Sequence, residues 1–186
     1  MSKLLVAVLA TLAVTAHAED NRNFIKFEGV TYNYQSSPND KSGFNLQLGR
    51  EVAPGVKLDV KSEFRVEENT EKISNRFEAG AQVEQKIPYV KVGVRSAVGE
   101  KFTNGDSYAY WLVEPFVSYD LTSDVSVKGS YRYRDAFDTD HNDRSNTYKV
   151  AVEYKYTTNT QFGVSVGKTT GDSEYTALQA AVTYKF

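Results

Sequence analysis

The stretch Val56-Lys57-Leu58-Asp59-Val60-Lys61-Ser62-Glu63-Phe64-Arg65-Val66-Glu67 decides the fold class of this sequence. Its even positions are apolar except for Ser62, and all of its odd positions are charged. A helix would mix the two kinds of residue around its circumference, whereas successive side chains of a strand point to opposite faces. The stretch therefore predicts a β-strand with one apolar face and one charged face.

The same period of two recurs along the chain and predicts an all-β protein of about ten strands. The segment near residues 24–34 is the least regular, because its aromatic face switches near Gly29. Most segments are as long as a tilted transmembrane strand (about 9 to 11 residues) and longer than the average soluble strand of about 5 or 6. The alternating segments lie around residues 24–34, 44–49, 56–67, 77–84, 90–95, 111–119, 125–134, 148–156, 162–166 and 178–186.

The connections between these segments alternate in length. Short turns are expected at residues 53–55, 86–88, 121–124 and 157–159, and longer polar links at residues 36–42, 67–72, 99–107, 135–145 and 169–174. Short turns on one side and longer loops on the other are typical of an up-and-down outer-membrane barrel. An even number of strands then places both ends of the barrel on the short-turn, periplasmic side.

Alternation alone does not say which face is wet, because a secreted sandwich or lipocalin-like barrel would show the same pattern with the apolar face inward. The aromatic residues favour a membrane, since they gather near strand ends, where two girdles are expected to meet the head groups. They are Tyr108, Tyr110, Trp111, Tyr131, Tyr133 and Tyr148 toward the loops, and Tyr119, Tyr154, Tyr156, Phe162, Tyr184 and Phe186 toward the turns. The sequence therefore predicts a closed antiparallel transmembrane barrel in the bacterial outer membrane.

Residues 1–18 have the pattern of a cleavable secretory signal peptide, which leaves residues 19–186 as the barrel. Lys3 precedes the apolar run Leu4–Ala16, and Ala16-His17-Ala18 is a small-x-small cleavage site. There is no cysteine, so packing and strand pairing must order the exported chain. With 22 basic and 24 acidic side chains, the near balance of charge argues against a nucleic-acid partner.

The segment Val182-Thr183-Tyr184-Lys185-Phe186 resembles the last strand of bacterial outer-membrane proteins. In those families the final aromatic residue is read by the barrel-assembly machinery, so the resemblance implies this machinery as a partner and Phe186 as the assembly signal.

Three further segments between Trp111 and Tyr156 are similar to the oligogalacturonate-specific porin family. They are Trp111-Leu112-Val113-Glu114-Pro115, Tyr131-Arg132-Tyr133-Arg134 and Asn146-Thr147-Tyr148. The resemblance implies a monomeric channel for acidic sugars, surrounded by outer-membrane lipid. It also implies about twelve strands, which is the alternative to the ten that the alternation predicts.

If the apolar faces touch lipid, the charged faces line the lumen. The predicted lining residues are Lys57, Lys61, Arg65, Arg76, Lys91, Arg95, Glu114, Lys128, Arg132, Arg134 and Lys149. The same faces also carry Lys155 and the acidic residues Asp59, Glu63, Glu67, Glu78, Glu84 and Glu153, so basic groups outnumber acidic ones by eleven to seven. This modest excess predicts a weak preference for small anionic solutes. A barrel of about eight strands is filled by side chains and one of about sixteen leaves a channel. A narrow porin-like channel and a plugged structural or adhesive barrel, cross-linked inside by ion pairs, therefore both remain open.

The loop around His141 carries the elements of a second alternative, an outer-membrane hydrolase. Asp140, Asp143 and Ser145 are close in sequence, but a catalytic triad needs groups that converge across the fold. A solvated acidic loop is therefore the preferred interpretation. The spacing of Asp138, Asp140 and Asp143 does not match an EF-hand loop, so no metal or other cofactor is expected.

Overall fold

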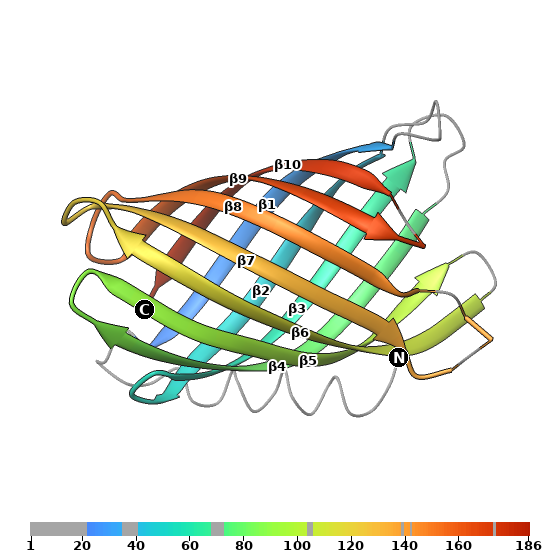
Figure 1. Ribbon diagram of the computed structural model, residues 1–186, viewed down its shortest axis with the longest axis horizontal. Helices are drawn as coiled ribbons and strands as arrows, with labels where there is room; N and C mark the ends of the chain where they lie inside the picture. The colour runs from blue at the N-terminus through green and yellow to red at the C-terminus, as the bar shows by residue number, and fades with distance from the viewer. Residues whose placement is uncertain are drawn as a thin grey trace.

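The computed structural model describes residues 22–34, 41–67, 73–103, 106–138, 140–141, 143–172 and 174–186, and the predicted signal peptide lies outside them. Ten strands follow one another along these residues (Figure 1). They are β1 (Asn23–Tyr34), β2 (Lys41–Ala53), β3 (Val56–Glu67), β4 (Ile73–Ile87), β5 (Val90–Thr103), β6 (Asp106–Asp120), β7 (Val125–Ala136), β8 (Ser145–Lys155), β9 (Thr160–Gly171) and β10 (Tyr175–Lys185). The described residues contain no helix that is long and apolar enough to span a bilayer.

Each strand pairs antiparallel with the next, and β1 pairs with β10 to close the barrel. At this seam Asn23 and Phe186 exchange backbone hydrogen bonds of 3.1 and 3.0 Å. The register is interrupted between Glu51 and Ala53, at the end of β2. The described part of the chain thus forms a closed ten-stranded up-and-down barrel. The ten strands predicted from the alternation are confirmed, and the twelve-stranded alternative is wrong.

The two ends of the barrel differ in their connections (Figure 1). We call one the turn end, because the short turns lie there together with the start of β1 and the end of β10; the other is the loop end. The difference in length between the connections at the two ends is smaller than expected, because only residues 104–105 join β5 to β6 at the loop end. Polar residues such as Lys101, expected in a long link, continue the strand because they face the barrel interior.

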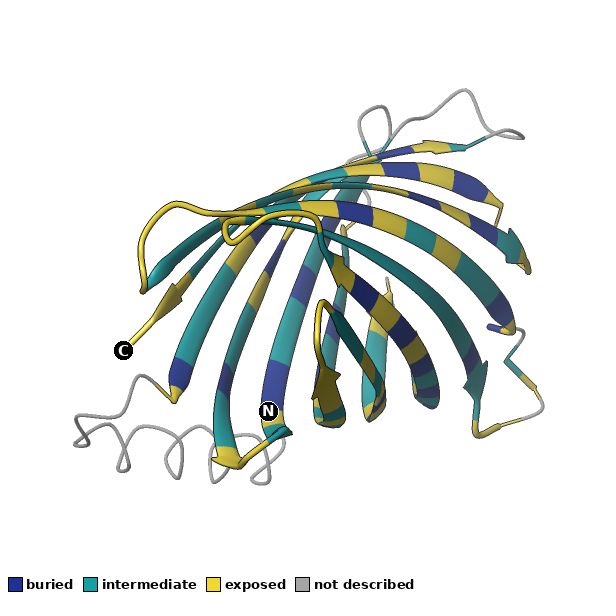
Figure 2. Ribbon diagram, turned by 60° about the vertical axis from the view of Figure 1, so that its left-hand side comes forward, coloured by how far each residue is buried: buried dark blue, intermediate teal, exposed yellow. Residues whose placement is uncertain are grey.

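The outer wall of the barrel is apolar and the interior is charged. Figure 2 shows how buried and exposed residues alternate along the strands. Large exposed side chains on the outer wall include Phe27, Phe44, Leu46, Leu58, Val83, Val94, Val117, Val150, Val152, Val164, Val166 and Leu178. Buried polar side chains include Glu28, Asn45, Asp59, Glu63, Arg65, Arg76, Glu78, Arg95, Glu114 and Arg134. A water-soluble barrel has its apolar side chains inside and its polar side chains outside, which is the opposite arrangement. A continuous apolar outer wall is stable in lipid. The soluble alternative is therefore wrong.

Aromatic pairs lie on the outer wall near both ends. At the loop end the rings of Trp111 and Tyr133 are 5.4 Å apart, and at the turn end those of Tyr156 and Phe162 are 5.9 Å apart. Such rings suit the interface between hydrocarbon and head groups. Tyr110, expected in the loop-side girdle, instead lies inside and is 0% exposed. Tyr110 lies four residues from Glu114 on β6, so both side chains point to the inner face of the strand. The position in the strand therefore decides where the ring lies, although tyrosine is typical of a girdle.

Candidate functional site: the charged lumen

Three adjoining cavities follow one another inside the barrel and narrow toward the loop end. The turn-side cavity has a volume of about 220 Å³, the central cavity about 120 Å³ and the loop-side cavity about 40 Å³. Lys26 and Lys128 line both the turn-side and the central cavity. Glu28, Lys61, Glu114, Arg132 and Lys149 line both the central and the loop-side cavity. The last five residues therefore surround the neck between the two narrower cavities.

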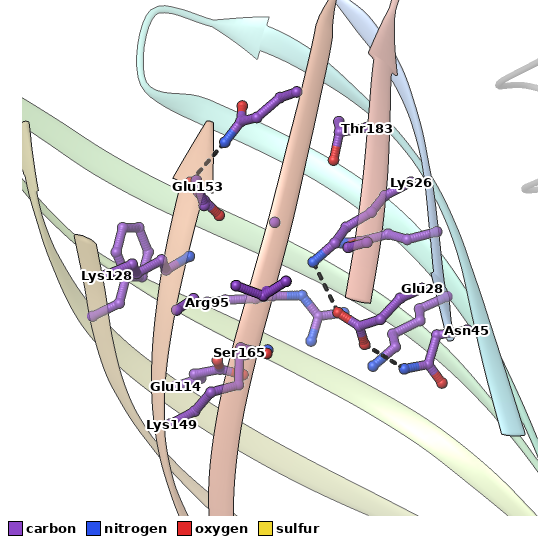
Figure 3. A pocket seen from close by; sticks show the side chains of 18 of the residues that line it. Lys26, Glu28, Asn45, Arg95, Glu114, Lys128, Lys149, Glu153, Ser165 and Thr183 are labelled. Atoms are coloured by element: carbon purple, nitrogen blue, oxygen red, sulfur yellow. Dashed lines mark hydrogen bonds and ion pairs between the residues drawn. The ribbon is translucent and has the colours of Figure 1, made fainter. Parts of the chain in front are cut away.

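The carboxylates of the central cavity already have partners (Figure 3). Glu28 lies 3.1 Å from Nζ of Lys26 and accepts a hydrogen bond of 2.6 Å from Nδ2 of Asn45. Glu114 accepts hydrogen bonds of 2.7 Å from Nε of Arg132 and 3.0 Å from Oγ of Ser130. These two acids are therefore neutralised by cations on neighbouring positions.

Two lysines of the central cavity lack such a partner. Nζ of Lys149 donates to Oε1 of Gln179 at 3.2 Å, and Nζ of Lys128 lies 4.0 Å from the ring centroid of Phe116. Within the described ranges, neither ammonium has a carboxylate in salt-bridge contact. The basic lining residues of this cavity are Lys26, Lys61, Arg95, Lys128, Arg132 and Lys149, and the acidic ones are Glu28, Glu114 and Glu153. The cavity consequently carries an excess of positive charge.

Arg95 cross-links the wall beside the central cavity. Its guanidinium binds Asp59 through two hydrogen bonds, of 2.7 Å from Nη2 and 3.1 Å from Nε. Nη1 reaches Glu78 at 3.1 Å, and the hydroxyl of Tyr110 donates to the same carboxylate at 3.1 Å. Paired geometry of this kind offsets the cost of burying the charges. The cluster joins β3, β4, β5 and β6.

A layer of arginine and tyrosine side chains fills the barrel beyond the loop-side cavity. The guanidinium of Arg65 lies 4.1 Å from the ring centroid of Tyr32 and 5.6 Å from that of Tyr175. Glu63 contacts Arg65 and lies 3.1 Å from Nη1 of Arg76. We define Tyr32, Arg65, Arg76, Tyr110 and Tyr175 as the arginine–tyrosine layer. All five are buried, and Tyr32, Arg65 and Tyr175 border the loop-side cavity.

Above this layer, the connection between β7 and β8 lies against the barrel mouth. Oδ1 of Asp143 is 2.7 Å from Nη2 of Arg134 and 3.7 Å from Nζ of Lys101. Nζ of Lys101 also donates to the hydroxyl of Tyr108 at 2.6 Å. The ring of His141 stacks on Tyr108 at 4.7 Å between centroids.

The same geometry bears on the hydrolase alternative. Nε2 of His141 lies 3.0 Å from Oδ2 of Asp106, and Nδ1 lies 3.7 Å from Oδ2 of Asp138. Both ring nitrogens thus face carboxylates, while Ser145 is buried at the start of β8. A nucleophilic site needs a hydroxyl within reach of the base. The described residues also contain no cluster of three metal-binding side chains.

All eleven predicted lining residues point into the barrel. Arg76 and Arg134 are buried in the arginine–tyrosine layer and at the mouth, and Arg65 lines the loop-side cavity. The others line the two larger cavities; they are Lys57, Lys61, Lys91, Arg95, Glu114, Lys128, Arg132 and Lys149. Their part in conduction stays a prediction.

Sequence reasoning missed several interior residues. Lys26 and Glu28 precede the switch of the aromatic face in β1, and Lys101 lay in an expected link. Their common signal is that each continues the charged face of its strand by steps of two. The fold and its two surfaces define an integral β-barrel of the bacterial outer membrane.

Comparison with known proteins supports this class. No family model and no curated protein matches the chain. Among solved structures, a KdgM porin in complex with disordered oligogalacturonate is 12% identical, with a TM-score of 0.51, 88% of this chain and 99% of that chain covered. An outer membrane channel from Pseudomonas putida F1 is 9% identical, with a TM-score of 0.56 and coverages of 92% and 100%.

A NanC porin is 8% identical to this chain, with a TM-score of 0.52 and coverages of 87% and 100%. At these identities the likeness concerns the fold. The resemblance to small porins inferred from the sequence is confirmed at that level, and these three structures are of channels.

Proposed function

We propose that the barrel is a narrow porin-like channel with a weak preference for small anionic solutes such as acidic sugars. The observation that carries the proposal is the tapering lumen with its basic excess, above all the ammonium groups of Lys128 and Lys149. A charge in a confined polar space needs a counter-charge or water. Mobile anions supply part of that counter-charge here, because Glu28 and Glu114 are bound to other cations and Glu153 is the one further carboxylate among the described lining residues of the central cavity.

The dimensions of the lumen imply a small conductance. The loop-side cavity, at about 40 Å³, is the smallest of the three and holds only a few water molecules, since one water needs roughly 10 to 15 Å³ of such volume. Passage of a sugar-sized solute therefore requires the arginine–tyrosine layer to move. We place the rate-limiting step of transport at this layer.

The proposal extends to the surroundings of the barrel. The apolar belt contacts outer-membrane lipid, the loop end faces outward and a monomer is sufficient for conduction. Phe186, which is hydrogen-bonded to Asn23 at the seam, serves as the assembly signal for the barrel-assembly machinery.

Planar-bilayer recording of the purified protein under a KCl gradient tests this function. We expect small unitary currents with a reversal potential on the anion side. Lys149→Gln and Lys128→Gln should each shift the reversal potential toward cations. Lys168→Gln is the matched control, because Lys168 is exposed on the outer wall. Cation preference of the unmodified channel would overturn the proposal.

The arginine–tyrosine layer favours a second candidate, a closed structural or adhesive barrel. Such a barrel would give silent bilayers although it is folded and inserted, as judged by its heat-modifiable mobility on gels. Reproducible currents from the inserted protein would exclude this candidate.

A further inference from the structure

The mouth of the barrel already holds a carboxylate, and the chain itself supplies it. Asp143 belongs to the connection between β7 and β8, yet it is only 2% exposed. Its Oδ1 contacts Arg134 at 2.7 Å and Lys101 at 3.7 Å. Lys101 pairs across β4 and β5 with Arg76, so a third cation is close to the same place. An acidic side chain thus occupies a pocket built by basic residues of the wall.

The fit between Asp143 and Arg134 is incomplete. Nε of Arg134 and Oδ2 of Asp143 are both buried, and neither has a hydrogen-bond partner among the described residues. An arginine fork and a carboxylate form their strongest contact through two parallel hydrogen bonds. Here only one of the two bonds is formed, which leaves a buried donor and a buried acceptor unsatisfied at a cost in free energy.

The backbone next to Asp143 explains why the second bond is missing. The backbone nitrogen of Arg144 donates to Oδ2 of Asp172 at 2.8 Å, and the nitrogen of Asp172 donates to the carbonyl of Arg144 at 2.9 Å. These contacts hold the chain directly after Asp143 against the end of β9. The tethered carboxylate reaches the guanidinium from this fixed position, whereas a free carboxylate could align with both nitrogens.

We propose that Arg134 and Lys101 form a binding site for the carboxylate of an external ligand, and that Asp143 occupies it as an internal competitor. An incoming carboxylate displaces Asp143, makes both hydrogen bonds to Arg134 and contacts Lys101. The inference rests on the proposed function only in that the ligand would pass through the channel. It narrows the small anionic solutes of that proposal to carboxylates. Displacement of Asp143 would also free the space that its side chain fills at the mouth of the barrel.

Formate, a minimal carboxylate, is the probe for this site. Thermal unfolding of the full-length protein, purified from membranes in detergent, is followed in sodium formate and in sodium chloride at equal ionic strength. Because a ligand of the folded state raises the unfolding temperature, Asp143→Ala should be stabilised by formate beyond chloride. We expect its half-saturating formate concentration to be at least tenfold lower than that of the unmodified protein.

Three further variants make the test specific. Asp143→Asn should not respond, because the amide still fills the pocket. The double variant Asp143→Ala with Arg134→Lys keeps the charge but loses the fork, and we expect it to lose the formate response. Asp140→Ala, an exposed change in the same connection, should behave as the unmodified protein.

Equal responses of Asp143→Ala to formate and chloride, or a response that survives Arg134→Lys, would overturn the site. The measurement needs no current. A formate response from a protein that gives no current in bilayers would therefore support the carboxylate site and overturn the proposed channel function. Anion currents without a formate response would support the channel function and overturn the site.

Discussion

The guanidinium of Arg95 lies against the backbone of Gly80 on the neighbouring strand, in the space that a side chain would take. A Cβ at Gly80 would lie 2.8 Å from Nη2 of Arg95 and 3.1 Å from its Cζ. Because Gly80 has no side chain, the guanidinium of Arg95 can lie against the backbone of β4 and bind Asp59 and Glu78 at the same time.

Gly80→Ala should destabilise the barrel by about 1 to 3 kcal/mol, because the added methyl group pushes the guanidinium from its partners. Urea unfolding followed by the fluorescence of Trp111, the single tryptophan, measures the change. Gly29→Ala is the control, since a Cβ there meets nothing within 4 Å. Its effect should stay within about 0.5 kcal/mol. Equal effects of the two substitutions would contradict the account of Gly80.

Arg95→Gln should be more damaging, because it leaves Asp59 and Glu78 buried without their cation. Removing one partner of a buried ion pair costs about 3 to 5 kcal/mol. Combining Arg95→Gln with Asp59→Asn and Glu78→Gln removes the uncompensated charge and should recover part of the loss. The same urea titration checks both variants, and a triple variant no more stable than the single one would count against the charge argument.

Tyr175→Ala should raise the conductance of the channel several-fold. The ring of Tyr175 packs on Tyr32 at 5.3 Å between centroids and borders the loop-side cavity, so its removal thins the arginine–tyrosine layer. Single-channel recording gives the measurement. Tyr148→Ala, at an exposed ring on the outer wall, should leave the unitary current unchanged. An unchanged current in Tyr175→Ala would place the narrowest point elsewhere.

Val150→Lys tests the lipid-facing wall. Val150 is 53% exposed near the middle of β8, and a lysine at the bilayer midplane costs about 2 to 4 kcal/mol in a transmembrane barrel. We expect that loss in phospholipid vesicles. The same substitution at Thr31, an exposed outer-wall residue nearer the loop end of β1, should cost less because it lies close to the interface. A neutral Val150→Lys would argue that this wall meets water.

The strands and the direction of their faces could be read from the sequence, because burial on one side imposes a period of two. In β3, Asp59, Lys61, Glu63 and Arg65 all face inward as the alternation predicts. The ends of strands were less predictable. Lysine is common in loops and tyrosine is common in aromatic girdles, so residue type alone does not predict that Lys101 and Tyr108 lie inside the barrel. Their paired positions on β5 and β6 place both side chains there.

The partners of the interior charges could not be predicted from the sequence. Arg65, Arg95, Arg132 and Arg134 are among the residues that the sequence places in the lumen lining. In the structure each binds a carboxylate, whereas Lys128 and Lys149 of the central cavity contact none among the described residues. Which arginine meets which acid depends on distances across the lumen, and these follow from closure of the barrel rather than from spacing along any one strand.

The seam between β1 and β10 pairs residues from opposite ends of the described chain, such as Phe24 with Lys185. A contact of such sequence separation carries the largest loop-closure entropy in the molecule. We therefore expect the seam to zip last, after the hairpins have assembled a curved sheet with two unsatisfied edges. Once the seam closes, none of the ten described strands has an unpaired edge to which another chain could add. Because the seam is an ordinary antiparallel pair, a circular permutant joined there and opened at the turn Leu121–Asp124 would retain the strand pairing.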